Sequence, residues 1–402
     1  MNILVFTTLW PNAEQPNLGV FIRNRTLALA RRPGVNVRVV APVPYFPRTL
    51  AGLAPPEWRK KARIPARETL EGLAVEHPRY LVTPKVGMRY YARWMAQGAT
   101  RIAGWLHARA PFDLIDAHYL YPDCLAALSL GQALNLPVVM SARGSDVNVF
   151  PGLPHIRPLI QQALAGADGM IAVSQGLKNE MLALGAAADR LRVIRNGVNG
   201  ALFYPREQGA ARQRLGLDPQ RKILLTVCSL TPRKGVDRLI EALARLRREN
   251  ENTNAMLCVV GEGPVRPALA ELIGRHNLRD HVLLAGAKPN AALADWYAAA
   301  DLFCFASHGE GCPNVVLEAQ ACGLPVLGAH VAGVDELLTD ADLGMLVPTD
   351  NPAQAFATAM RQALARAWDR ELIAGKGSGR AWEDVAADNE AFMREVIARR
   401  RK

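Results

Sequence analysis

The sequence predicts an α/β fold made of two Rossmann-like domains, each built on a parallel sheet. Apolar, strand-like runs alternate with helix-like segments along the whole chain, which is typical of βα units. At ~100–200 residues per domain, a chain of 402 residues is long enough for two such domains. Because ligands of open parallel sheets bind outside the carboxyl ends of the strands, we expect the two domains to face each other across an interdomain cleft.

Twelve segments have the composition of buried strands, six in each half of the chain. They are residues 2–7, 36–42, 112–118, 137–142, 169–173 and 192–194, then residues 222–229, 255–260, 281–285, 301–305, 325–329 and 345–347. A polar stretch at residues 206–220 separates the two sets, which predicts domains at 1–204 and 205–380. Residues 381–402 predict a long charged helix that could pack back on the first domain.

Positive charge is concentrated in the first half of the chain. Residues 1–200 carry 23 Lys and Arg against 12 Asp and Glu, so their net charge of +11 equals that of the whole chain. Residues 201–402 carry 25 residues of each sign and are neutral. The first domain is therefore expected to meet anionic partners, and on charge alone these include nucleic acid and an anionic membrane surface.

A basic segment at residues 48–109 holds twelve basic and four acidic residues, interleaved with aromatic ones. Its last part, residues 89–109, predicts an amphipathic helix. Six bulky side chains can share one face of that helix: Tyr91, Trp94, Met95, Ile102, Trp105 and Leu106. Two interpretations remain open, namely a core helix with a solvated basic side and a helix that makes shallow contact with a membrane.

Cellular context is predicted from what the sequence lacks. The longest uncharged run, residues 124–142, is interrupted by Gly131, Asn135 and Pro137, so we expect a helix, a turn and a strand rather than a membrane span. The first residues do not have the pattern of a signal peptide, and the six cysteines form no CxxC pair. No cluster has metal-ligand spacing. We expect a metal-independent, cytoplasmic protein, with peripheral contact at the inner face of the cell membrane left open.

The most informative motif is a pair of glutamates, Glu310 and Glu318, placed where an apolar strand gives way to a helix. Pro313 suits the first helical position, because a residue there needs no N–H. Backbone N–H groups at a helix start bind anions, so those near Asn314 and Val315 could hold a phosphate. An acid, a phosphate site and a second acid form a layout that fits a sugar nucleotide.

Two further strand ends in the second half carry residues suited to the same ligand. Arg233 and Lys234 follow the strand at 222–229, where their charges could neutralise a leaving diphosphate. The strand at 281–285 ends at Gly286, and the backbone from there to Lys288 could meet a base. The second domain is therefore predicted to bind the nucleotide part of the ligand.

Short motifs with glycine, charged or polar residues occur in both halves of the chain. In order they are Pro16-Asn-Leu-Gly19, Asp116-Ala-His118, Arg143-Gly-Ser-Asp146, Val173-Ser-Gln-Gly176, Val193-Ile-Arg-Asn-Gly-Val198, Arg233-Lys234, Val260-Gly-Glu-Gly-Pro264 and the Glu310/Glu318 motif. As an ordered set they resemble the retaining glycosyltransferases of family 4, which have the two-domain GT-B fold. The resemblance covers almost the entire chain, and the opening segment is similar to members that build bacterial surface polysaccharides.

The resemblance implies a catalytic role for four residues. Arg233 and Lys234 would grip the donor diphosphate and stabilise its charge as it leaves. Glu310 would contact the donor sugar, and His118 would lie beside the sugar that is transferred. No cofactor is implied, because the donor is itself a nucleotide-diphosphate sugar, with UDP- and GDP-sugars as the expected kinds.

The resemblance also implies how the rest of the donor is held. The diphosphate would meet the helix start at Asn314 and Val315, and Glu318 would hold the ribose. The segment from Gly286 to Lys288 would meet the base. The backbone at Gly19 would close over the phosphates from the other domain.

The sequence departs from the family pattern at two positions. Many members have histidine where Arg143 stands and aspartate where Asn199 stands. Arg143 and Asp146 belong to the acceptor side, so Arg143 is expected to tune acceptor choice by pairing with an anionic group. The expected acceptor is a hydroxyl of a glycan or of a lipid-linked glycan.

Three other classes of function compete with this prediction. A nonhydrolysing sugar-nucleotide epimerase has the same fold, but it needs acid and base residues that we cannot place. A nucleic-acid-binding protein would explain the basic half but not a neutral half laid out for a diphosphate, so no nucleic-acid partner is expected. An NAD-dependent enzyme is disfavoured, because no GxGxxG follows the first strand.

Overall fold

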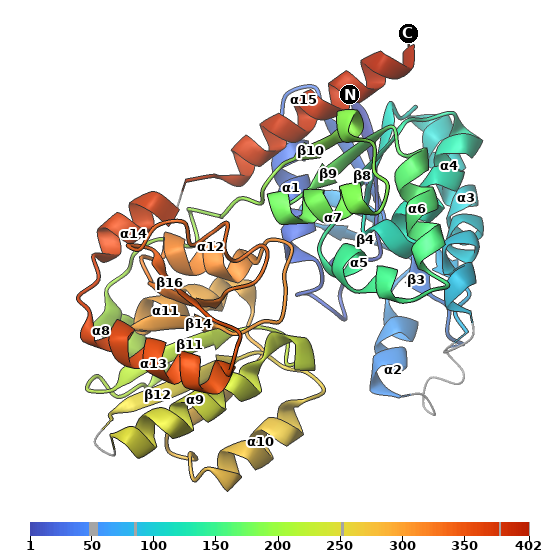
Figure 1. Ribbon diagram of the computed structural model, residues 1–402. Helices are drawn as coiled ribbons and strands as arrows, with labels where there is room; N and C mark the ends of the chain where they lie inside the picture. Colours follow the sequence, from blue (N-terminus) through green and yellow to red (C-terminus); the bar gives the residue numbers. More distant parts are fainter. Residues whose placement is uncertain (48–54, 84–86, 251–252, 378, 402) are drawn as a thin grey trace. The chain divides into compact units, whose positions relative to one another are not determined.

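The computed structural model describes residues 1–47, 55–83, 87–250, 253–377 and 379–401 (Figure 1). Parts of the basic segment, at 48–54 and 84–86, and the last residue of the expected terminal helix lie outside the described residues. The chain divides into two compact units. Unit 1 comprises Met1–Asn196 and Trp382–Lys402, and unit 2 comprises Gly197–Ala381.

Unit 1 is built on an eight-stranded sheet. Its order is β10 (Leu191–Val193), β9 (Gly169–Ala172), β8 (Val138–Ser141), β7 (Leu114–His118), β1 (Asn2–Phe6), β2 (Asn36–Val40), β5 (Leu73–Glu76) and β4 (Arg67–Leu70). All strands but β4 run parallel. A small separate pair joins β3 (Val43–Pro44) to β6 (Arg79–Tyr80). The six strands predicted for this half are all present.

The helices of unit 1 follow the strands in the expected alternation (Figure 1). They are α1 (Val20–Ala30), α2 (Pro56–Arg63), α3 (Tyr91–Arg109), α4 (Leu125–Leu134), α5 (Ser145–Asn148), α6 (Arg157–Gly166), α7 (Gln175–Ala183) and the terminal α15 (Trp382–Arg401). Trp382, Phe392 and Val396 of α15 join the core that β1, β2 and α1 share, so this last helix is an integral part of unit 1.

Unit 2 has a six-stranded, fully parallel sheet. Its order is β13 (Val282–Gly286), β12 (Ala255–Val260), β11 (Lys222–Val227), β14 (Leu302–Phe305), β15 (Val326–Ala329) and β16 (Gly344–Val347). Its helices are α8 (Gln208–Leu215), α9 (Val236–Glu249), α10 (Arg266–Arg275), α11 (Leu293–Ala299), α12 (Asn314–Ala321), α13 (Pro352–Ala365) and α14 (Arg370–Gly377). All six predicted strands are again present, which confirms the α/β fold with two parallel-sheet units.

Helices cover both faces of the unit 2 sheet, because successive side chains of a strand point to opposite faces. Along β11, Leu225 and Val227 pack with α11 and α12, whereas Leu224 packs with α9 and α13. The central strands β12, β11, β14 and β15 are buried on both faces and are therefore almost continuously apolar, as parallel strands generally are.

The division between the units differs from the boundary expected at 204/205. Residues 197–204 belong to unit 2, since Val198 and Phe203 are buried in its core and Val198 forms an isolated parallel bridge with Ala381. The polar stretch taken as a separator is largely the helix α8, which packs on α11. The polar composition of this stretch hid the helix, because only one side of α8 is buried.

The helix predicted over residues 89–109 forms as a 3-10 turn, Met88–Tyr90, followed by α3. The predicted apolar face is only partly correct. Met95 and Leu106 are buried, but alanines supply most of the buried face and Trp105 is 44% exposed, with the Arg109 guanidinium over its ring. Small alanines let α3 approach its neighbour α4 closely. Among the described helices, none is both long and apolar enough to cross a membrane.

Candidate active site

Most of the residues predicted to bind the nucleotide sugar lie in the loops at one edge of the unit 2 sheet. In a parallel sheet the carboxyl ends of all strands meet at the same edge. Arg233 and Lys234 follow β11, Glu310 follows β14, and Gly286 ends β13. Since β12, β11 and β14 are neighbours, the loops after these strands are brought together by the sheet order itself.

Glycines allow these loops to approach one another closely. Gly235 has φ +63° and closes the 3-10 turn Pro232–Lys234, and a Cβ there would lie 2.2 Å from the Ala306 carbonyl oxygen. A Cβ on Gly261, after β12, would lie 1.8 Å from the carbonyl oxygen of Cys228. No other residue fits these positions without movement of the backbone. The close approach places the Arg233-Lys234 turn directly against the segment that leads to Glu310.

Glu310 lies between the two predicted cations. Its carboxylate is 2.6 Å from Lys234 Nζ and 3.6 Å from Arg233 Nη2, and it accepts a hydrogen bond of 2.6 Å from Ser307 Oγ. Backbone bonds fasten the same loop, because the Arg233 carbonyl accepts from His308 N at 2.9 Å. Arg233, Lys234 and Glu310 thus form a fixed cluster with a net positive charge, suited to an anionic ligand.

The helix that carries Glu318 starts one residue later than predicted. Pro313 is the N-cap, with φ −74° and ψ 107°, and α12 begins at Asn314. Asn314 and Val315 therefore form the first turn, where the helix dipole is positive. Glu318 lies in the second turn, as the sequence indicated. The sequence placed these residues correctly because a proline next to a short apolar run is a strong helix-start signal.

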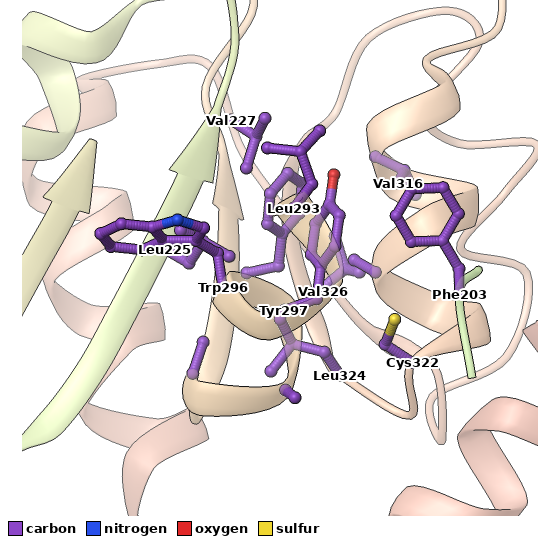
Figure 2. Close-up of a cluster of buried hydrophobic side chains, with 14 of the residues drawn as sticks. Phe203, Leu225, Val227, Leu293, Trp296, Tyr297, Val316, Cys322, Leu324 and Val326 are labelled. Carbon is purple, nitrogen blue, oxygen red and sulfur yellow. The ribbon is translucent and has the colours of Figure 1, made fainter. Parts of the chain in front are cut away.

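Glu318 is held by a buried tyrosine that the sequence analysis did not single out. Tyr297 of α11 lies in the core facing α12, and the ring of Phe203 packs against it (Figure 2). The ring of Phe303 also packs against that of Tyr297. The Tyr297 hydroxyl donates to Glu318 Oε2 at 2.9 Å, and the Asn290 side chain also bonds this carboxylate. Asn290 lies just after the Gly286–Lys288 segment, so the residues predicted to meet the ribose and the base are neighbours in the fold.

Burial raises the pKa of Glu318 to about 7, even though the hydrogen bonds from Tyr297 and Asn290 favour the charged form. The unfolded chain then loses this proton at a lower pH than the native protein does. The contribution of Glu318 to stability is therefore complete below the pH at which the unfolded side chain ionises, and it is lost as the pH rises to about 7.

We expect Glu318→Gln to remove this pH dependence, because glutamine stays neutral and can still accept from Tyr297. The variant should gain melting temperature relative to the wild type as the pH is raised from about 5 to 8. Thermal unfolding at several pH values measures the difference. A difference that does not change with pH would show that the carboxyl of Glu318 is not perturbed by burial.

The unit 1 residues of the predicted site also lie at the carboxyl edge of their sheet. Gly19 precedes α1 after β1, His118 ends β7, and Arg143 follows β8. Gly19 has φ +61°, and a Cβ there would lie 2.0 Å from the Leu9 carbonyl oxygen, so this turn requires glycine. The strands β8, β7 and β1 are neighbours in the sheet, which brings these three loops together within unit 1.

His118 is fully buried, and polar groups surround its ring. Arg143 Nη2 is 2.7 Å from Nδ1, and Asp116 Oδ2 is 3.4 Å from Nε2. Burial lowers the pKa of His118 to about 3, against the opposing effect of Asp116. In this structure the ring is therefore neutral at ordinary pH and is covered by side chains from neighbouring elements.

Arg143 and Asp146, the predicted acceptor residues, have different surroundings. Arg143 is partly exposed, and its guanidinium lies over the ring of Phe21 at the start of α1. Asp146 is fully buried, and its carboxylate accepts from the backbone N–H groups of Arg143, Gly144 and Leu120 at 2.8–3.2 Å. Asp146 shapes the loop that presents Arg143, and Arg143 is the more accessible of the two side chains.

Several residues of the site escaped the sequence analysis, notably Arg25, Ser307 and Tyr297. A signal for Arg25 was present, since it lies on the same side of α1 as the buried Ile22 and Leu29. A charge within a buried stripe indicates a specific partner. Within the described ranges, no group of three or more His, Cys, Asp and Glu side chains is arranged to hold a metal ion.

Comparisons with known proteins match both halves of the chain. Residues 18–201 match the family described as Glycosyltransferase Family 4, and residues 207–376 match the family Glycosyl transferases group 1. Among curated relatives, the chain is 30% identical over 364 residues to TuaC of Bacillus subtilis, a glycosyltransferase named for teichuronic acid biosynthesis. That alignment covers 90% of this chain and 88% of TuaC.

Solved structures show the same fold. A sucrose-phosphate synthase from Thermosynechococcus elongatus aligns with a TM-score of 0.80 and 22% identity, over 99% of each chain. HepE of Anabaena in complex with UDP-glucose aligns with a TM-score of 0.67 and 18% identity, over 99% of this chain and 98% of HepE. The two-unit architecture is therefore the GT-B fold.

Proposed function

Because the chain belongs to the family 4 glycosyltransferases, a retaining family that uses nucleotide sugars, we propose that its donor is a UDP- or GDP-sugar and its acceptor a glycan or lipid-linked hydroxyl. We place this reaction in the assembly of a bacterial surface polysaccharide. The observation that carries the proposal is the cluster of Arg233, Lys234 and Glu310 at the carboxyl edge of the unit 2 sheet.

In the proposed reaction the acceptor hydroxyl attacks the anomeric carbon from the face on which the diphosphate leaves. The bond from that carbon to the phosphate oxygen breaks, the bond to the acceptor oxygen forms, and the acceptor proton passes to the departing phosphate oxygen. No strong protein base is needed. The protein supplies positive charge to the diphosphate through Arg233, Lys234 and the first turn of α12.

Glu310 has a second role in this proposal, because its carboxylate lies beside both cations. It orients Lys234 through the 2.6 Å ion pair, and it contacts the donor sugar, where it can stabilise developing positive charge. Glu318 holds the ribose, and Gly286 to Lys288 meet the base. The link through Asn290 supports this last pair of assignments, since it ties the base segment to the ribose residue.

A thermal-shift screen against UDP-, GDP- and ADP-sugars tests the donor proposal. A ligand at 100 times its Kd should stabilise the protein by about 2.7 kcal/mol, because it binds only the folded state. We expect one nucleotide class to raise the melting temperature in this way. Lack of stabilisation by every nucleotide sugar would argue against the transferase proposal, and epimerisation of the sugar without an acceptor would indicate the epimerase instead.

For the acceptor, we propose an anionic or lipid-linked glycan. The excess positive charge lies entirely in the first half of the chain, and TuaC, the relative matched over most of its length, is named for teichuronic acid biosynthesis. Arg143 is placed to contribute, because it is partly exposed at the edge where His118 and Gly19 also lie. Its buried neighbour Asp146 keeps the loop in place.

We further propose that unit 1 touches an anionic membrane surface through α2 and the segments beside it. Arg59 and Lys60 are exposed on α2, and Lys61 lies over the ring of Trp58, 4.8 Å from its centroid. Tyr45 and Leu81, which follow the paired strands β3 and β6, are 53% and 51% exposed. Exposed aromatic and aliphatic side chains beside several cations are typical of surfaces that bind membrane headgroups.

Neutralising Arg59, Lys60 and Lys61 together with glutamine is expected to reduce binding to liposomes that contain anionic lipid. Each basic residue near such a surface contributes about 1 kcal/mol, so the three together should weaken binding by roughly 100-fold. Cosedimentation of the protein with the liposomes measures this loss of binding. Neutralising the exposed Arg248, Arg275 and Arg279 of unit 2 makes the same change in net charge, and an equal loss in that control would contradict a specific surface.

A further inference from the structure

One buried cation of unit 1 has no role in the reaction described above. Arg25 lies in α1 and is only 2% exposed. Its Nη1 is 3.1 Å and 3.2 Å from the two ring nitrogens of His118, 3.3 Å from Asp116 Oδ2 and 3.3 Å from Ser141 Oγ. The guanidinium therefore contacts the ends of both β7 and β8.

The other end of this guanidinium is held by the terminal helix. Arg25 Nη2 donates to Asn389 Oδ1, and the amide of Asn389 in turn donates to the Val385 carbonyl at 2.6 Å. Asn389 is fully buried, in a helix that packs along α1 (Figure 1). A residue near the end of the chain thus fixes the side chain that lies against His118.

The polar contacts around His118 define its protonation. Arg143 Nη2, 2.7 Å from Nδ1, can only donate a hydrogen bond, so Nδ1 must be the acceptor. The ring proton then lies on Nε2, which faces Asp116 Oδ2 at 3.4 Å. Arg143 thus pairs with the acceptor of the neutral ring, and the ring N–H faces the Asp116 carboxylate at ion-pair distance.

The charged groups that face the ring come from three parts of unit 1. They are Arg25 on α1, Asp116 on β7 and Arg143 after β8, while the neutral Ser141 lies on β8 and Thr7 donates to the His118 carbonyl. Two positively charged guanidinium groups and only one carboxylate already lie around the ring. A proton added to the ring would be a third positive charge in a buried site, which is unfavourable.

We infer that Arg25 is a positioning residue that fixes His118 as a neutral, Nε2-protonated ring, and that Asn389 of the terminal helix anchors Arg25. The inference deepens the proposed function, on which it rests, since His118 is the residue assigned beside the transferred sugar. His118 then acts by its fixed polarity and not as a proton donor or base. The terminal helix becomes part of the machinery that holds the site.

The test is nitrogen NMR of the ligand-free protein labelled with ¹⁵N-histidine, because ring nitrogen shifts report tautomer and charge directly. Comparison with His118→Gln assigns His118 among the eight histidines. We expect the wild-type ring to be the neutral Nε2–H form with no titration between roughly pH 5 and 8. Arg25→Met should raise the pH at which the ring titrates, and Asn389→Ala should shift it in the same direction by less.

Activity gives an independent second readout. Turnover of the nucleotide sugar should fall roughly 10- to 100-fold in Arg25→Met, with little change in KM, because the ring is displaced and not removed. Glu395→Gln, which removes an exposed ion pair of the same helix with Arg192, is the control and should leave spectrum and turnover unchanged. The NMR result does not depend on the identity of the substrate, so it separates this inference from the proposed function.

Two results would overturn the inference. One is a wild-type His118 that is charged, or protonated on Nδ1, at neutral pH. The other is a His118 spectrum in Arg25→Met that matches the wild type while the variant still unfolds cooperatively. If Arg25→Met does not fold, Asn389→Ala decides the question, since it leaves the buried guanidinium in place and removes only its anchor.

Discussion

Replacing Lys234 with alanine is expected to lower turnover by roughly 100- to 1000-fold, the loss typical when one preorganised donor to a developing anion is removed. The side chain of Lys234 is 22% exposed, and Nζ pairs only with Glu310 among the ion pairs of the described residues. The fold should therefore tolerate the change. In the proposed reaction the leaving diphosphate would lose one of the two cations assigned to it, and kcat for sugar transfer measures the effect.

Lys222 offers a matched control on the same strand. It is exposed at the amino end of β11, whereas Lys234 follows the carboxyl end. Lys222→Ala removes the same charge from the same unit and should leave turnover unchanged. Unchanged turnover in Lys234→Ala with folding intact would reject the diphosphate role.

A double variant separates two explanations for a loss in Lys234→Ala. The lysine could act directly on the diphosphate, or it could act by orienting the Glu310 carboxylate 2.6 Å away. In the Glu310→Gln background the carboxylate is absent, so an indirect effect should disappear there. A direct effect should persist, and the coupling between the two changes measures the share of each.

The strands were predictable from sequence because their signal is local. Each predicted strand is a short, mostly apolar run, and burial in the sheet makes such runs conspicuous. The hairpin of β4 and β5 was missed because its charged residues were assigned to the basic segment. Its turn, Glu71-Gly72, has positive φ at both residues, which is the geometry of a tight hairpin turn. Of the two residues only Gly72 is typical of that geometry, so the sequence signal was weak.

The contacts that organise the site could not be predicted in the same way. Arg25 and Asn389 are 364 residues apart, and each lies in an ordinary helical pattern until α1 and α15 pack together. Tyr297 likewise has the pattern of a core aromatic residue, and only the fold shows that its hydroxyl reaches Glu318. Motifs identified the residues that we assign to the ligand, whereas the residues that hold them in place depend on tertiary packing.

Gly235→Ala is expected to disrupt the proposed donor site, and the chain contains a closely matched control. Gly235 and Gly216 have almost the same backbone conformation, φ 63° and ψ 29° against φ 65° and ψ 31°. A Cβ on Gly216 would meet no atom within 4 Å, whereas one on Gly235 would lie 2.2 Å from the Ala306 carbonyl oxygen. The two variants therefore share the conformational cost and differ in the clash.

Gly216→Ala should lose about 1 kcal/mol of unfolding free energy, the cost of a left-handed conformation for a residue with a Cβ. Gly235→Ala should lose more, because the obstacle is backbone and cannot rotate away. The movement that relieves the clash separates the Arg233-Lys234 turn from the loop of Glu310, so turnover should fall roughly 100-fold. Chemical unfolding and kcat measure the two effects.

Equal stability and equal turnover in the two alanine variants would mean that the turn and the Glu310 loop are not held by this contact. A loss of stability in Gly235→Ala without a loss of turnover would mean that the turn can move while the cluster keeps its geometry. Either outcome would contradict the prediction for Gly235→Ala. The proposed reaction depends on Lys234 and Glu310 being held within ion-pair distance, and Gly235 is the position where the backbone makes that distance possible.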